Sequence, residues 1–256
     1  MSKGYVDTHA HLYAEEFSGE IDDVITRARE SGVSKIILPN IDTGTIEDML
    51  MLCDDHPDLC FPALGLHPTS VSGNYKSDLD QLATYFNKRK FFGIGETGID
   101  LYWDTSFEKE QVDAFRIQLG WAKEKNLPVI IHTRNAFDLV YGVVNEFRGT
   151  VRGVFHCFTG TLEEAEKIIS LETFKMGIGG VITYKNSALP DVIEKISLEH
   201  LILETDSPYL PPVPFRGKRN ESSYILKIAE KVASTKKCSV EEIAEITKKN
   251  AEEIFG

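Results

Sequence analysis

The chain has 256 residues, 42% of them hydrophobic, which is enough to bury the core of one large α/β domain or of two small ones. Its formal net charge of -12 excludes the broad basic face of proteins that coat nucleic acids regardless of sequence, but not a small basic patch. The chain has no apolar run as long as a membrane span, about 18 residues, and no signal-peptide pattern at its start, so we expect a cytoplasmic protein without a membrane partner.

Eight apolar runs rich in β-branched residues recur along the chain. Several of them are continuously hydrophobic rather than alternating, which is typical of parallel strands that are covered on both faces. The runs are residues 4–8, 35–41, 60–67, 91–98, 128–133, 152–158, 174–182 and 201–206.

Amphipathic helical patterns lie between these runs, for example at residues 21–28, 112–122 and 165–169. Ser239 and Glu242 have the spacing of a capping box that opens a last helix. Eight strand-then-helix units in about 250 residues match the size of a (β/α)₈ barrel. A doubly wound sheet is the alternative, but THAHL stands where its glycine-rich turn belongs. We therefore predict an α/β fold, a (β/α)₈ TIM barrel, with residues 1–256 as a single domain.

Most of the histidines fall at the carboxyl ends of the predicted strands. These ends converge on one mouth of a barrel, so that side chains far apart in sequence become neighbours. A lone buried histidine is more often hydrogen-bonded in a core, but four imidazoles with two carboxylates exceed the ligands of one tetrahedral ion. This set favours two divalent metal ions that share a bridging carboxylate. The predicted metal ligands are His9, His11, Glu96, His132, His156 and Asp206, with Glu96 as the bridge.

Other residues near the strand ends are candidates for contacts with the substrate or with a metal ligand. His67, in GLHP, has no metal partner nearby in sequence, and we expect it to bind substrate. Arg134 follows His132 by two residues and offers a fork for a phosphate, unless it is a structural ion-pair partner. Asp7 either orients a ligand or is a hydrogen-bonded strand residue.

The loop after the eighth strand is the most basic short segment of the chain. Four prolines in the stretch 208–214 stiffen it before Arg216, Lys218 and Arg219. A basic cluster at the mouth of an acidic protein favours local capture of an anion, such as a phosphate of the substrate, over a merely solvated loop. Tyr102 and Trp103, after the fourth strand, either stack on a base or pack against the rim.

Six motifs in order resemble the TatD family of metal-dependent deoxyribonucleases, within the amidohydrolase-like barrel superfamily. They are VDTHAHL, GLHP, GETGID, IHTR, FHCFTG and LETDSPYL with the following RGKRN, and the similarity extends from Asp7 to Ala251. The resemblance implies a (β/α)₈ fold, one to three divalent ions (Mg²⁺, Mn²⁺ or Zn²⁺) and hydrolysis of phosphodiesters, trimming DNA from a 3′ end.

By position, the resemblance assigns the residues to two ions and to substrate. Glu96 would serve both ions, and His67, Arg134 and Glu204 would serve substrate or chemistry. The first ion would be held by His9, His11, Glu96 and Asp206, and the second by Glu96, His132 and His156.

Three functions remain open at this point. The first is a metal-dependent exonuclease, with Asp206 or Glu204 accepting the proton of the attacking water. The second is an amidohydrolase-like enzyme that acts on a small amide, ester or lactone, and the basic loop favours phosphate over it. The third is a non-catalytic metal or nucleic-acid binding protein, which the presence of a spare base disfavours.

Overall fold

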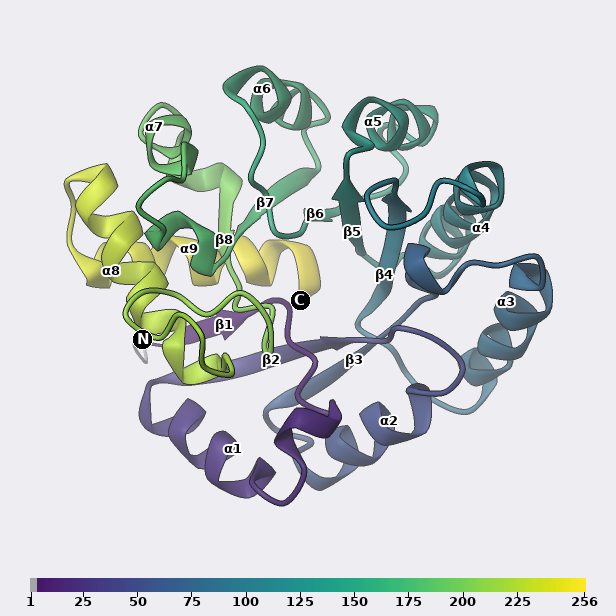
Figure 1. The fold of residues 1–256 in the computed structure, drawn as a ribbon, viewed down its shortest axis with the longest axis horizontal. Coiled ribbons are helices and arrows are strands. Elements are labelled where there is room, and N and C mark those ends of the chain that lie inside the picture. Colours follow the sequence, from purple (N-terminus) through teal and green to yellow (C-terminus); the bar gives the residue numbers. More distant parts are fainter. Residues whose placement is uncertain (1–3) are drawn as a thin grey trace.

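The computed structural model describes residues 4–256 as a ring of eight parallel strands with helices on the outside (Figure 1). Neighbouring strands pair in chain order, from β1 to β8. This is the (β/α)₈ barrel that the sequence predicts, and each predicted strand is present. The strands are β1 (Tyr5–Asp7), β2 (Val33–Pro39), β3 (Cys60–Leu64), β4 (Gly93–Asp100), β5 (Val129–Arg134), β6 (Gly153–Phe155), β7 (Phe174–Ile178) and β8 (Leu201–Leu203).

Helices follow the strands and cover the outer face of the ring (Figure 1). The helical patterns predicted at 21–28, 112–122 and 165–169 fall in α1, α4 and α6. No helix within residues 4–256 has the length and apolar character needed to cross a membrane. The helices are α1 (Ile21–Glu30), α2 (Ile46–Asp55), α3 (Tyr75–Ala83), α4 (Glu108–Lys125), α5 (Phe137–Glu146), α6 (Leu162–Ser170), α7 (Leu189–Ile193), α8 (Ile225–Lys236) and α9 (Val240–Phe255).

Side-chain caps fix where two of these helices begin. Ser239 accepts a hydrogen bond from the backbone N–H of Glu242 at 3.1 Å and so caps α9 as its spacing predicts. The reciprocal capping box, with both hydrogen bonds, lies instead at Thr161 and Glu164, where α6 begins. Each cap satisfies backbone donors that the first helical turn leaves without a partner.

The ring closes between β1 and β8 through the residues that follow these two short strands. Thr8 N donates to Leu203 O at 3.2 Å, and further along Asp206 N donates to His9 O at 2.9 Å. Ala10 and Ser207 form an isolated parallel bridge. These contacts hold two segments from opposite ends of the chain, VDTHAH and LETDSP, side by side.

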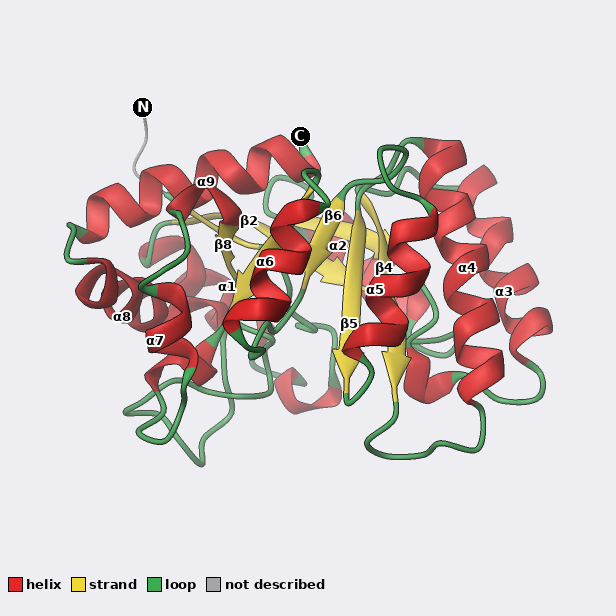
Figure 2. Cartoon of the chain, turned by 90° about the horizontal axis from the view of Figure 1, so that it is seen from above, coloured by secondary structure: helices red, strands yellow, loops and turns green. Residues whose placement is uncertain are grey.

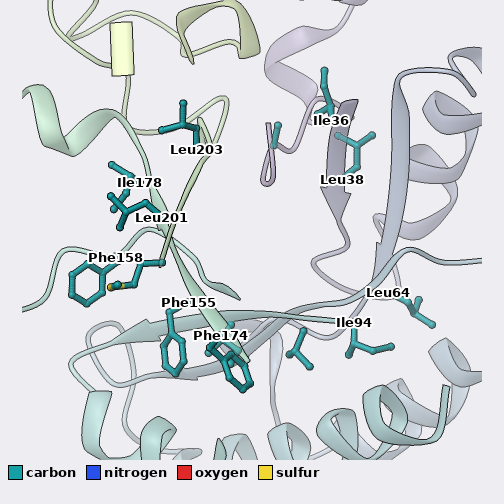
Figure 3. Packing of buried hydrophobic residues seen from close by; sticks show 14 of the residues in the cluster. Ile36, Leu38, Leu64, Ile94, Phe155, Phe158, Phe174, Ile178, Leu201 and Leu203 are labelled. Carbon is teal, nitrogen blue, oxygen red and sulfur yellow. The ribbon is translucent and has the colours of Figure 1, made fainter. Parts of the chain in front are cut away.

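Outward-facing side chains of the strands pack against the helices. The rings of Phe155 and Phe174, on β6 and β7, lie 5.7 Å apart between centroids, and Leu201 and Leu203 continue this layer on β8 (Figure 3). A fully buried side chain of this size stabilises the fold by about 1.5–3 kcal/mol. The outer layer therefore carries much of the stability of the barrel.

Inward-facing side chains form a separate apolar cluster at one end of the barrel, which α9 covers (Figure 2). Ile130, Val154 and Ile202 contribute from the strands, and Ile254 and Phe255 from the end of α9. Because alternate residues of a strand share a face, the inward positions continue two residues later toward the opposite end. Those positions are His132, His156 and Glu204.

Candidate metal centre

The mouth of the barrel lies at the strand ends opposite α9 (Figure 2). Most of the polar side chains that the sequence singles out gather there. His9 and His11 follow β1, and their Nε2 atoms lie 3.0 Å apart. The bridge at Ala10 keeps this segment extended, so that both imidazoles share one face. Tyr13 fixes the ring of His11, since its hydroxyl lies 2.9 Å from Nδ1 of His11 and donates to Pro39 O.

Glu96, on β4, is central because its two carboxylate oxygens face different sets of histidines. Oε2 lies 3.1 Å from His9 Nε2 and 3.4 Å from His11 Nε2. A carboxylate between two sets of nitrogen atoms has the position of a bridging ligand. Oε1 faces the second set, at 2.8 Å from His132 Nδ1, 3.1 Å from His156 Nε2 and 3.2 Å from His67 Nε2.

The donor atoms fit divalent metal ions. A tetrahedral site with bonds of about 2.0–2.1 Å places its ligand atoms about 3.3 Å apart, close to the separations around Glu96. Five ring nitrogens converge on this carboxylate, which offers about four lone-pair sites, and a cation would relieve the crowding. Three groups have ligand atoms within 4.8 Å of one another: His9, His11 and Asp206; His9, Glu96 and His156; and His67, Glu96 and His132.

Burial and mutual attraction set the protonation of the cluster. Burial raises the pKa of Glu96, but the nearby imidazoles of His67, His156 and His9 outweigh this effect and hold that pKa well below its usual range. Burial lowers the pKa of His9 well below its ordinary value. An ionised carboxylate and a neutral imidazole are the forms that bind a metal.

Asp100, at the end of β4, holds the ring of His132. Its Oδ2 lies 2.9 Å from His132 Nε2, so that Nδ1 faces Glu96. Burial lowers the pKa of His132, but the hydrogen bonds to Asp100 and Glu96 outweigh it and raise that pKa. A carboxylate behind a ligand imidazole fixes its tautomer and orientation. Sequence reasoning misses Asp100, and the available signal is its even spacing from Glu96 on the same strand.

Asp206 and Glu204, after β8, occupy different places. Asp206 Oδ1 lies 3.7 Å from His9 Nε2 and 3.8 Å from His11 Nε2. Burial raises the pKa of Asp206 to about 6, although His156 and His11 act against it. Glu204 is fully buried behind His156, with Oε1 3.3 Å from His156 Nδ1. Asp206 therefore joins the first histidine pair, whereas Glu204 contacts the side of the His156 ring that faces away from Glu96.

Two glycines make room for the carboxylates of Glu204 and Glu96. A Cβ atom at Gly177, on β7, would overlap Glu204 Oε2, which has no hydrogen-bond partner within residues 4–256. A Cβ atom at Gly65, after β3, would lie 2.5 Å from the carbonyl carbon of Gly95. Close approach of the backbones at Gly65 thus lets Glu96 reach the centre of the mouth.

His67, expected to bind substrate, lies among the candidate ligands. Its Nε2 is 3.3 Å from His132 Nδ1, and its Nδ1 is 2.6 Å from the hydroxyl of Thr69. Burial lowers the pKa of His67, which favours the neutral, metal-binding form. His67 is thus placed to bind either an ion or a group held by that ion.

Asp7, for which the sequence leaves two roles open, connects the first and last strands. It accepts hydrogen bonds from Thr205 N at 2.9 Å, from the Thr205 hydroxyl at 2.7 Å and from the Ser222 hydroxyl at 2.6 Å. Its contact with His9 is to the backbone N–H, at 3.4 Å. Asp7 therefore positions the segment of His9 rather than the imidazole.

The three arginines expected to bind substrate have different environments. The guanidinium of Arg134 lies 3.7 Å from the centroid of the Tyr102 ring, and that of Arg216 lies 3.9 Å from the centroid of Tyr184. Arg219 instead donates a hydrogen bond of 2.9 Å to Glu20 Oε2. The first two are exposed on aromatic rings near the mouth, whereas Arg219 ties the β8 loop to the segment before α1.

The chain resembles known proteins over nearly its whole length. The profile of the TatD-related DNases matches residues 6–256. YabD of Bacillus subtilis, described as an uncharacterized metal-dependent hydrolase, is 39% identical over 97% of this chain and 98% of its own. YjjV of Escherichia coli, described in the same words, is 34% identical over 98% of each chain.

Solved structures show the same architecture. The crystal structure of YjjV, a TatD homologue from Escherichia coli, superposes with a TM-score of 0.92 at 32% identity and covers 100% of this chain and 99% of its own. A TatD family hydrolase from Entamoeba histolytica has a TM-score of 0.88 at 23% identity, with 100% and 99% of the two chains covered. The resemblance seen in the sequence motifs and the barrel fold are both confirmed.

Proposed function

The chain belongs to the family of TatD-related DNases, and on that premise we propose that it is a metal-dependent hydrolase of phosphodiesters that removes nucleotides from single-stranded or frayed DNA 3′ ends. The observation that carries the proposal is the place of Glu96, each of whose oxygens faces a separate set of imidazoles. Two ions roughly 3.5–4 Å apart form the centre of many phosphatases and nucleases. The carboxylate of Glu96 lies where two such ions would share a ligand.

We assign Glu96 to both ions, which would be Mg²⁺, Mn²⁺ or Zn²⁺. His67 contacts Glu96 and His132, and it is a further candidate ligand or substrate contact beside the second ion. When bound, the ions acidify water and neutralise charge on the phosphate. His9, His11, Asp206 and Glu96 would hold the first ion, and Glu96, His132 and His156 the second.

The positions of the remaining residues assign each of them a separate role in catalysis or substrate binding. Asp206 is the candidate base, because its side chain is 13% exposed at the rim beside the His9 and His11 pair, where a water can approach. Glu204 is a positioning residue for His156, since it lies behind that ring. Arg134, at the end of β5, and Arg216, in the loop after β8, are placed to bind phosphates on either side of the scissile bond.

The direct test follows a 5′-labelled single-stranded oligonucleotide with Mg²⁺ or Mn²⁺, and with EDTA. We expect a ladder of products shortened from the 3′ end only when metal is present. Phosphorothioate linkages at the 3′ end should block this shortening. The His132→Ala variant, purified in the same way, controls for a contaminating nuclease.

Two other outcomes would contradict the proposal. Intact DNA together with metal-dependent turnover of small amides, esters or lactones would establish the amidohydrolase-like alternative. Binding of DNA without cleavage under every metal condition would indicate a non-catalytic binding protein.

A further inference from the structure

Exposed apolar side chains gather at the mouth. Of the seven large hydrophobic residues exposed within residues 4–256, six belong to segments that follow β4, β5 or β8. The exception is Met51, on α2. Clustering of exposed apolar surface marks a place where a partner or ligand binds. The six residues are Tyr102, Trp103, Leu139, Tyr209, Leu210 and Val213.

Two of these side chains form an aromatic corner with an arginine. Trp103 is 68% exposed and Tyr102 is 52% exposed, so neither packs into the rim. Their ring centroids are 4.9 Å apart, with the rings nearly perpendicular. The guanidinium of Arg134 lies 3.7 Å from the centroid of Tyr102 and 5.1 Å from that of Trp103. The corner therefore presents aromatic faces and a positive charge to solvent.

One carboxylate joins this corner to the candidate metal centre. Asp100 Oδ1 accepts hydrogen bonds from the backbone N–H groups of Tyr102, at 2.9 Å, and Trp103, at 3.3 Å. Its Oδ2 lies 2.9 Å from His132 Nε2. Asp100 thus links the imidazole of His132 to the backbone of Tyr102 and Trp103. Both aromatic residues lie on the loop that joins β4 to α4 (Figure 2).

A cleft continues from the corner past the strand ends. It has a volume of about 690 Å³ and is lined by Tyr102, Arg134 and Phe137 together with Cys157, the neighbour of His156. Thr133, the neighbour of His132, also lines it, so a strand that lies in this cleft would pass next to the residues assigned to the second ion.

We infer that Tyr102, Trp103 and Arg134 form a platform on which an unpaired nucleobase of the substrate strand stacks. This inference rests on the proposed function and names how that site holds its substrate. Aromatic rings with a nearby guanidinium bind any base through its π-face, so the platform tolerates all sequences. A base inside a duplex has no free face, so the platform selects single-stranded or frayed ends.

Fluorescence of Trp103 tests the platform without any need for catalysis. The chain has two tryptophans, so Trp121→Phe leaves Trp103 as the only reporter. The Mg²⁺-loaded protein is titrated with a phosphorothioate-linked oligothymidylate and with an abasic strand of equal length. We expect the base-containing strand to quench Trp103 and to bind about tenfold more tightly, as the loss of one stacked base implies. Equal quenching and equal affinity for the two strands would overturn the platform.

A kinetic comparison separates this inference from the proposed function. Trp103→Ala is expected to raise KM for a cleavable single strand about tenfold, while kcat and the KM for an abasic strand stay unchanged. Met51→Ala, which removes an exposed side chain from α2, is the matched control and changes neither value. Hydrolysis of both strands with equal KM by the wild type would exclude the platform alone, whereas hydrolysis of neither strand would exclude the nuclease.

Discussion

At the end of the barrel that α9 covers, the inward-facing side chains of the strands are apolar, whereas at the mouth they are imidazoles and carboxylates. Ile130, Val154 and Ile202 have His132, His156 and Glu204 two residues later on the same strand segments. Two residues span about 7 Å of strand. The interior of the barrel therefore changes from packed apolar core to polar site over two residues of each strand.

The two ends differ in what stabilises them. The α9 end gains free energy from burial of apolar area, at about 25 cal/mol per Å². The mouth buries Glu96 and Glu204 among imidazoles, and an uncompensated buried charge is costly. A barrel of this kind separates stability from function, so that variants at the two ends should change different measurements.

The largest effect is expected at the centre of the mouth. Glu96→Ala removes the only carboxylate that faces both sets of imidazoles among the described residues. Loss of charge stabilisation worth about 4 kcal/mol corresponds to a fall in kcat of about 1,000-fold. Steady-state hydrolysis of DNA measures it, with the exposed Glu241→Ala as the control. Near-normal activity in Glu96→Ala would remove Glu96 from the bridging position.

The opposite end should lose stability instead. Ile254→Ala, at the end of α9, leaves a cavity beneath the apolar cluster and is expected to lower the free energy of unfolding by about 2–5 kcal/mol. Activity per folded molecule should stay at the wild-type level. Urea unfolding and assays below the transition test both parts. A large fall in kcat with little change in unfolding would mean that the two ends are coupled.

A smaller effect on activity is expected at Gly177, which packs against the carboxylate of Glu204. Gly177→Ala forces Glu204 to move from behind His156, because the new methyl group would overlap its carboxylate. We expect activity to fall about 10- to 100-fold, as for other groups that orient a metal ligand. Gly179→Ala is the matched control, since its Cβ atom would meet its nearest neighbour at 3.8 Å. Equal activity of the two variants would contradict the positioning role of Glu204.

The smallest effect is expected at Asp100. Asp100→Asn keeps an oxygen beside His132 but removes its charge, so metal affinity should fall about tenfold. Calorimetric titration with Mn²⁺ measures this change. Asp104→Asn, in the same loop but bonded to Ser106, should bind as the wild type does. An unchanged affinity in Asp100→Asn would show that the hydrogen bond to His132 does not tune the site.

The sequence predicts the fold because the pattern of the strands is local. Continuous β-branched runs at regular intervals require parallel strands, and strand ends in a barrel meet at one mouth. His132 and His156 could be placed at that mouth from this rule alone. The segment of His9 and His11 also follows it, although β1 ends at Asp7, because the bridge at Ala10 extends the pairing.

Contacts between distant side chains could not be predicted in the same way. Arg219 pairs with Glu20, which is 199 positions away, so its charge is neutralised by a loop whose path no local pattern fixes. His67 lies beside His132, 65 positions away, after a strand end that Gly65 lets approach β4 closely. The place of Glu204 depends on the glycine at 177, on another strand. Such relations arise from closure of the ring, not from spacing along the chain.

The central claim is that Glu96 is shared by two ions, and a crystal of the protein grown with Mn²⁺ tests it most directly. The anomalous difference map should contain two peaks roughly 3.5–4 Å apart, one beside each oxygen of Glu96. The first peak should lie among His9, His11 and Asp206, and the second beside His132. A single peak, or peaks that lie away from Glu96, would contradict the claim.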